Sequence, residues 1–105
     1  MSDTVQRNVE ARRFELIRDG VVAGFIDYRE RDDNQIWFTH TEVDAAFAGQ
    51  GLATILTQGA VEDALADPDA VLVPACPYTR TWLKKHPEFA DRVDESPLPP
   101  ESEHS

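Results

Sequence analysis

The residues best suited to bind a ligand form a short glycine-containing run. The run reads FAGQGLA at positions 47–53 and follows the apolar, aromatic segment 36–43. Behind it, from Leu52 onward, apolar residues recur every three or four positions, which predicts a helix with one buried face. A strand followed by Gly-x-Gly at a helix start leaves the first helical N–H groups unpaired at the positive end of the helix dipole. An anion, most often a phosphate, is the expected partner, because glycine lets it approach the backbone closely.

The glycine run differs from two well-known phosphate motifs. No Lys-Ser or Lys-Thr pair follows Gly51, which excludes a Walker loop, and the third glycine of a dinucleotide fingerprint is missing. The pattern therefore leaves two interpretations open, a phosphate site of another class and a plain loop with a helix cap.

Side chains capable of acid–base or nucleophilic chemistry lie on both sides of the run. His40 and Glu42 are the titratable residues of the strand-like segment 36–43. A neutral histidine is poised near physiological pH, and a carboxylate can act as a base through one water molecule. Cys76 and Tyr78 follow a second apolar segment, and they offer a thiol and a phenol. These four residues are the candidate catalytic residues.

The combination of these features resembles the GNAT superfamily of acetyl-CoA-dependent N-acetyltransferases, in its small single-domain branch. The resemblance is carried by HTEV at 40–43, FAGQGLA at 47–53, VPACPY at 73–78, Trp82-Leu83 and HPEF at 86–89. It covers about residues 9–93. The chain departs from the family pattern at Ala48, where the superfamily usually has Arg or Gln, so one phosphate contact is expected to be weaker or missing.

The resemblance implies that the chain binds acetyl-CoA or coenzyme A. The residues that would hold the pyrophosphate, mainly through backbone N–H groups, are Gly49, Gln50, Gly51, Leu52 and Ala53. The strand before the loop would separate from its neighbour, so that the pantetheine arm lies in the gap. Thr41 and Val43 would then lie beside the thioester, where a backbone N–H would polarise its carbonyl. Arg80, together with Lys84 and Lys85, would help to balance the charge of the anionic donor.

The resemblance also implies transfer of an acetyl group to an amine by direct attack in a ternary complex. His40 or Glu42 would deprotonate the amine, and Cys76 or Tyr78 would protonate the departing thiolate. For His40 and Glu42 the alternatives are a hydrogen bond within the sheet and an exposed strand end. For Cys76 they are inert packing, a thiol in the site without covalent chemistry, and a nucleophile activated by a helix N-terminus and Arg80.

A second interpretation keeps the same fold but assigns the chain a different function. It is a coenzyme-A-binding or protein-interaction module with little turnover. Ala48 favours it, and so does the lack of the two N-terminal helices that help to wall the acceptor pocket in larger relatives. Without those helices we expect an acceptor side that is open or completed by a partner subunit, in a monomer or a weak homodimer.

The composition limits the kinds of partner that the chain is expected to bind. The chain has 105 residues and a net charge of −10. Such acidity repels nucleic-acid phosphates and anionic membranes, and it favours a cationic acceptor such as a protein lysine or a small polyamine, unless it serves only solubility. A single cysteine and the lack of a visible export signal or membrane span predict a cytoplasmic protein. Three widely spaced histidines and one cysteine form no metal-ligand pattern.

Hydrophobic patterning predicts an α+β or three-layer fold with one small, mixed and largely antiparallel sheet. By resemblance this is a GNAT-like core that lacks the usual N-terminal helices. We expect a disordered tail over 1–8, an acetyltransferase-like domain over 9–94 and an acidic disordered tail over 95–105.

Within the domain, the pattern predicts a strand over 9–17 with a bulge near 12–13, then a hairpin turn at Asp19-Gly20 and a returning strand over 21–28. A central strand follows over 36–43, and strict alternation would place Phe38, His40 and Glu42 on one face of it. A crossover helix over 50–66, a short parallel strand over 71–73 and a short helix beginning near Pro77 complete the expected fold.

Overall fold

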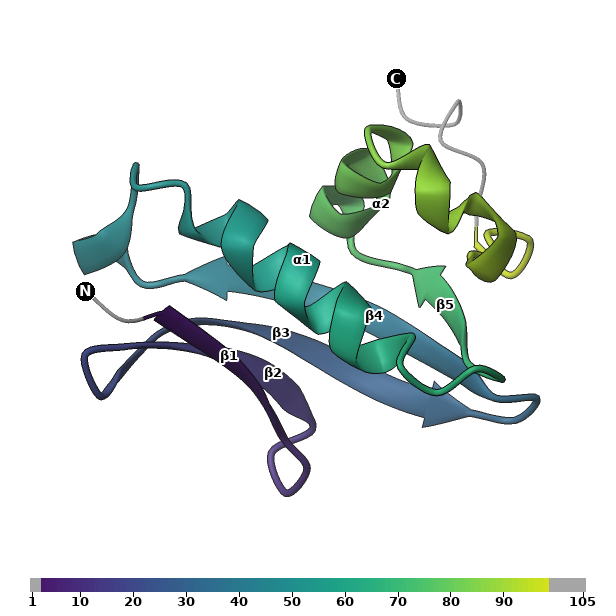
Figure 1. Cartoon of the computed structure of the whole chain (residues 1–105), viewed down its shortest axis with the longest axis horizontal. Helices are drawn as coiled ribbons and strands as arrows, with labels where there is room; N and C mark the ends of the chain where they lie inside the picture. Colours follow the sequence, from purple (N-terminus) through teal and green to yellow (C-terminus); the bar gives the residue numbers. More distant parts are fainter. Residues whose placement is uncertain (1–2, 99–105) are drawn as a thin grey trace.

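Five strands form a single sheet that follows the order of the chain. The computed structural model describes residues 3–98. The strands are β1 (Asp3–Asn8), β2 (Arg13–Arg18), β3 (Val21–Arg31), β4 (Gln35–Val43) and β5 (Val71–Pro74), in the order β1-β2-β3-β4-β5 (Figure 1). Strands β1 to β4 pair antiparallel, whereas β4 and β5 pair parallel. This confirms the predicted α+β fold with a mixed, largely antiparallel sheet.

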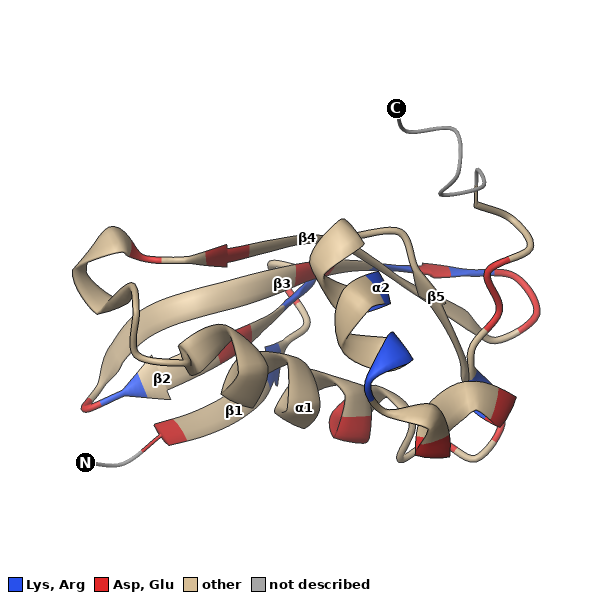
Figure 2. Cartoon of the chain, turned by 90° about the horizontal axis from the view of Figure 1, so that it is seen from above, with Lys and Arg blue, Asp and Glu red and all other residues tan. Residues whose placement is uncertain are grey.

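Two α-helices cover one side of this sheet. Helix α1 (Leu52–Ala64) makes the crossover between β4 and β5 and packs against β1, β2, β3 and β4. Helix α2 (Pro77–Lys84) follows β5 and contacts α1, β4 and β5. Figure 2 shows both helices on the same side of the sheet, so the described residues form two layers rather than three. The shorter 3₁₀ helices are η1 (Ala45–Phe47) and η2 (Pro87–Arg92).

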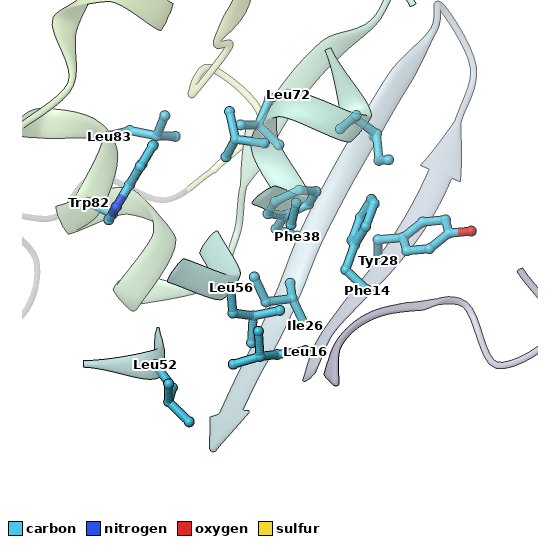
Figure 3. Packing of buried hydrophobic residues seen from close by; sticks show 14 of the residues in the cluster. Phe14, Leu16, Ile26, Tyr28, Phe38, Leu52, Leu56, Leu72, Trp82 and Leu83 are labelled. Carbon is cyan, nitrogen blue, oxygen red and sulfur yellow. The ribbon is translucent and has the colours of Figure 1, made fainter. Parts of the chain in front are cut away.

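The hydrophobic core lies between the sheet and these helices (Figure 3). Its fully buried members include Phe14 from β2, Ile26 from β3 and Phe38 from β4, which pack with Leu56 of α1 and Leu72 of β5. Because one cluster joins all of these elements, the position of α1 relative to β4 and β5 is fixed by close packing.

The structure corrects the prediction of a disordered tail over 1–8 for Asp3–Asn8, which form the edge strand β1. The sequence gives little sign of this strand, because Val5 is its single strongly apolar residue. Backbone pairing with β2 and ion pairs from Arg7 to Asp63 (2.8 Å) and from Arg18 to Asp3 (2.7 Å) hold it in place. Residues 99–105 of the predicted acidic tail lie outside the described residues.

A hairpin turn, rather than a bulge, explains the change of alternation within residues 9–17. Strand β1 ends at Asn8 and β2 begins at Arg13. The Asn8 side chain accepts a hydrogen bond from the Ala11 N–H (3.1 Å), and Arg12 adopts the left-handed conformation with φ of 56°. Residues 9–12 of the predicted strand therefore form the turn, and only its second half, from Arg13 onward, is a strand.

A bulge does occur in β4, and it changes which side chains face the core. Asp27 pairs with His40 while its neighbour Tyr28 pairs with Phe38, so Thr39 is an extra residue without a partner in the ladder. Past this point Val43 turns toward the core, and His40 and Glu42 are exposed. The prediction that Phe38, His40 and Glu42 share one face is therefore wrong, because the extra residue reverses the alternation.

Candidate active site

The candidate site lies where β4 and β5 separate. The parallel ladder runs from Gln35 opposite Val71 to Phe38 opposite Pro74, and the Cys76 N–H then donates to the Phe38 carbonyl (2.8 Å). After Cys76 the chain turns away into α2, whereas β4 continues to Val43 beside β3 alone. The second half of β4 thus borders a gap that no strand of residues 3–98 fills.

Backbone groups of β4 point into this gap. The Asp44 N–H donates to the Ala23 carbonyl of β3 (2.8 Å), so Asp44 directs its N–H toward β3. Because backbone direction alternates along a strand, Thr41 and Val43 direct their backbone groups to the opposite side, into the gap. An extended ligand lying there could therefore bond to them as an added strand would.

Cys76 and Thr41 meet at the point where the strands part. The Cys76 Sγ lies 3.3 Å from the Thr41 Oγ1, and Cys76 is buried at the residue that caps the N-terminus of α2. Tyr78, two residues further on, has its hydroxyl 3.2 Å from the Thr54 Oγ1 in the first turn of α1. Residues 76–78 therefore connect the gap to the N-terminal end of α1.

His40 and Glu42 lie on the other face of the sheet. The His40 Nε2 is 3.2 Å from the Glu42 Oε1, and their side chains are 56% and 60% exposed. The imidazole also lies near the Phe25 ring, with ring centroids 6.1 Å apart. The two candidate bases thus form one hydrogen-bonded pair on the helix-free side, whereas Cys76 and Tyr78 lie on the helix side.

The glycine run forms the loop that the sequence predicts, directly before α1. Gly49 and Gly51 have φ of 80° and 73°, in the left-handed region that favours glycine. A Cβ atom added at either position would meet no other atom within 4 Å, so both face open space. Gly51 caps the 13-residue helix α1 without a side-chain hydrogen bond, and the first helical N–H groups therefore remain available to an anion.

A contact absent from the sequence prediction anchors this loop. Arg18 at the end of β2 donates to the Gln50 side-chain oxygen, and it also donates to both carboxylate oxygens of Asp3. The Arg18 hydrogen bond lowers the pKa of Asp3, and the same bond raises the pKa of Arg18. The sequence spacing of Arg18, Asp3 and Gln50 indicates neither contact, because each joins segments that only the folded chain brings together.

Arg80 of α2 forms an ion pair with Glu95 (Nε to Oε1, 3.3 Å), a contact that the sequence did not predict. His86, which directly follows Lys85, donates from Nδ1 to the Trp82 carbonyl (2.8 Å) and so caps the C-terminal end of α2.

Known proteins provide an independent comparison. A sequence model of the GCN5-related N-acetyltransferase family matches residues 13–92, which include β4, the glycine loop, β5 and both α-helices. The solution structure of a GCN5-like protein from Staphylococcus aureus is similar, with a TM-score of 0.65 and 22% sequence identity over 97% of this chain and 96% of that one. No curated protein matches the chain. At this identity the structural likeness supports the fold alone.

Within residues 3–98, no three or more His, Cys, Asp and Glu side chains gather where they could hold a metal ion. None of the helices in the same range is both long and apolar enough to span a membrane.

Proposed function

Because the chain belongs to the GCN5-related N-acetyltransferase family, we propose that it transfers an acetyl group from acetyl-CoA to an amine by direct attack in a ternary complex. The observation that carries this proposal is the gap between β4 and β5, bordered by backbone groups of Thr41 and Val43. The open N-terminus of α1 at Gly51 lies at the end of the loop that follows β4.

Binding of the donor uses two parts of this arrangement. The loop from Gly49 to Ala53 provides N–H groups and the positive end of the α1 dipole for the pyrophosphate. The pantetheine arm, which carries amide groups of its own, pairs with Thr41 and Val43 in the gap. A backbone N–H of β4 then polarises the thioester carbonyl and stabilises the negative charge that develops on its oxygen.

The two proton transfers take place on opposite faces of the sheet. The amine approaches from the helix-free face, where His40 takes its proton and Glu42 orients the imidazole through their 3.2 Å contact. The nitrogen–carbon bond forms as the carbon–sulfur bond breaks. The departing thiolate then takes a proton on the helix face, where the Tyr78 hydroxyl is held by Thr54.

Cys76 in this proposal shapes the site without forming a covalent intermediate. Its side chain is buried and its Sγ is in contact with the Thr41 hydroxyl, so it packs where the two strands part. A buried thiol in such surroundings behaves mainly as a small apolar group. Direct attack by the amine therefore requires no acetyl-cysteine.

The acceptor is an exposed, positively charged amine, either a protein lysine or a small polyamine. Among residues 3–98, no helix covers the β4 face that carries His40 and Glu42 (Figure 2), so a bulky acceptor can reach it. The net charge of −10 favours cationic partners over anionic ones.

The alternative is a coenzyme-A-binding or interaction module with little turnover. The exposure of the His40–Glu42 pair favours it, because a solvated pair is a weak general base compared with a desolvated one. The discriminating experiment incubates the protein with acetyl-CoA and a panel of lysine peptides and polyamines. Acetylated product together with free thiol supports the transferase. Saturable binding of acetyl-CoA without product from any amine supports the module.

A further inference from the structure

A row of arginines lies on the face of the sheet from which the proposed acceptor approaches. In β3, Asp27 pairs with His40 of β4, and Arg29 and Arg31 follow two and four residues further along the strand. Because side chains alternate along a strand, both arginines lie on the same helix-free face as Asp27. The Arg31 guanidinium lies over the Trp37 ring, 4.5 Å from its centroid. The arginines therefore continue the face that carries His40.

These arginines line a cavity of about 420 Å³ at the end of β3. Its lining residues are Arg12, Tyr28, Arg29, Glu30 and Arg31. Three arginines and one glutamate make the cavity positive, in a chain whose net charge is −10. The cavity therefore attracts an anionic partner, whereas the chain as a whole attracts cationic ones.

Two of the guanidinium groups in the cavity have no partner within the chain. Arg12 and Arg29 are exposed, and neither side chain forms a hydrogen bond or an ion pair with another of residues 3–98. By contrast, Arg7, Arg13 and Arg18 each pair with an aspartate. A guanidinium group binds a carboxylate through two parallel hydrogen bonds, so Arg12 and Arg29 favour carboxylates on a partner.

The cavity also contains an open edge of β3. The pairing of β2 with β3 ends at Arg13 opposite Asp27, and the Tyr28 N–H then donates to the Arg12 carbonyl (3.0 Å). Glu30 directs its backbone groups to the same side as Tyr28, where no strand of residues 3–98 pairs with it. An extended peptide that continues the line of β2 would pair with these groups.

We propose that this cavity binds an acidic peptide segment, whose carboxylates pair with Arg12 and Arg29 while its backbone pairs with Glu30. The consequence for the acceptor rests on the proposed function. The rise of a strand places Arg29 and Arg31 about 7 Å and about 13 Å from the position opposite His40, which about two to four residues of extended peptide span. The preferred acceptor is therefore a peptide lysine at that distance from glutamates or aspartates, rather than a polyamine.

The test is calorimetric titration of two peptides in the absence of any acyl donor. Each peptide has one lysine, which is flanked on both sides by glutamates in the first peptide and by glutamines in the second. We expect the glutamate peptide to bind about tenfold more tightly, as charge-assisted hydrogen bonds to arginine provide. The double variant Arg12→Gln/Arg29→Gln should abolish that ratio. Arg13→Gln is the matched control, because Arg13 already pairs with Asp27, lies outside the cavity and should leave the ratio intact.

Steady-state acetyl transfer to the same peptides provides a second readout. The glutamate peptide should have the lower KM and the same kcat, because the arginines bind the acceptor away from the reacting atoms. The double variant should raise its KM to that of the glutamine peptide.

The outcomes separate this inference from the proposed function. Equal affinity for the two peptides, or tighter binding of a short single-stranded DNA than of the glutamate peptide, would overturn the inference and leave the proposed function intact. Preferential binding of the glutamate peptide, without acetylation of either peptide, would support the binding site and favour the interaction module over the transferase.

Discussion

The Thr41 hydroxyl and the Cys76 thiol lie 3.3 Å apart, across the point where β4 and β5 stop pairing. This contact joins the second half of β4 to the start of α2 at the mouth of the gap. It also holds the cysteine with its sulfur turned toward the strand, where the thioester would lie in the proposed complex.

Replacing the two candidate acids should separate their roles. Tyr78→Phe should lower kcat about a hundredfold, because general acid catalysis contributes on that scale. Cys76→Ser should lower it by no more than about tenfold, since the thiol packs rather than reacts. Steady-state kinetics at saturating donor and mass spectrometry of the intact protein check both expectations. Loss of all turnover in Cys76→Ser, or an acetyl group found on the wild-type cysteine, would contradict direct attack.

The His40–Glu42 pair should behave as one unit in kinetics. His40→Ala should lower kcat about a hundredfold, and Glu42→Gln about tenfold, because the carboxylate acts by orienting the ring. The double variant should be no slower than His40→Ala alone, since residues that act together are not additive. Multiplied losses in the double variant, measured over the pH–rate profile, would show two independent roles.

Gly59 should be intolerant of a side chain although it lies within a helix. A Cβ atom there would lie 2.7 Å from the Val5 Cβ, because β1 crosses α1 at this point. Gly59→Ala should therefore destabilise the protein by about 1–2 kcal/mol, with overpacking outweighing the gain in helix propensity. Thermal and urea unfolding measure the change. Adding Val5→Ala should recover stability, and a stabilised Gly59→Ala variant would contradict the packing of β1.

The link from Asp3 to Arg18 should give stability that depends on pH. The hydrogen bond from Arg18 lowers the pKa of Asp3 in the folded state. Its contribution is therefore fully present above the ordinary aspartate value of about 3.9 and is lost as the pH falls through the lowered value. Asp3→Asn should be less stable than wild type at pH 7, and the difference in melting temperature should shrink as the pH falls below the ordinary aspartate value. A difference in melting temperature between wild type and Asp3→Asn that is the same at every pH would refute the Asp3–Arg18 link.

Local signals in the sequence predicted the elements around the site well. Gly49 and Gly51 marked the loop because their left-handed conformations are costly for other residues. Pro77 lies at the first position of α2, where its missing N–H costs nothing. The turn at Asp19-Gly20, where both residues have positive φ, and the parallel β5 after the crossover helix were also as predicted.

Features that depend on tertiary contacts were not predictable in this way. The mostly polar β1 forms because β2 pairs with it and α1 leaves room at Gly59. The bulge at Thr39 turns His40 away from the core, and a period-2 pattern cannot show where one extra residue is inserted. The Arg18–Gln50 and Thr54–Tyr78 contacts join distant segments, which no local spacing encodes.

The most direct test of the central claim is calorimetric titration of acetyl-CoA into wild type and two variants of Gly51. Asp and Asn have nearly the same shape and both tolerate the left-handed conformation at this position, so Gly51→Asp and Gly51→Asn differ mainly in charge. We predict saturable binding to wild type, a loss within about tenfold for Gly51→Asn, and a loss of at least about a hundredfold for Gly51→Asp, because its carboxylate would occupy the anion site. Melting curves of both variants confirm that they are folded. No binding to wild type at millimolar acetyl-CoA, or equal binding to all three proteins, would contradict the account.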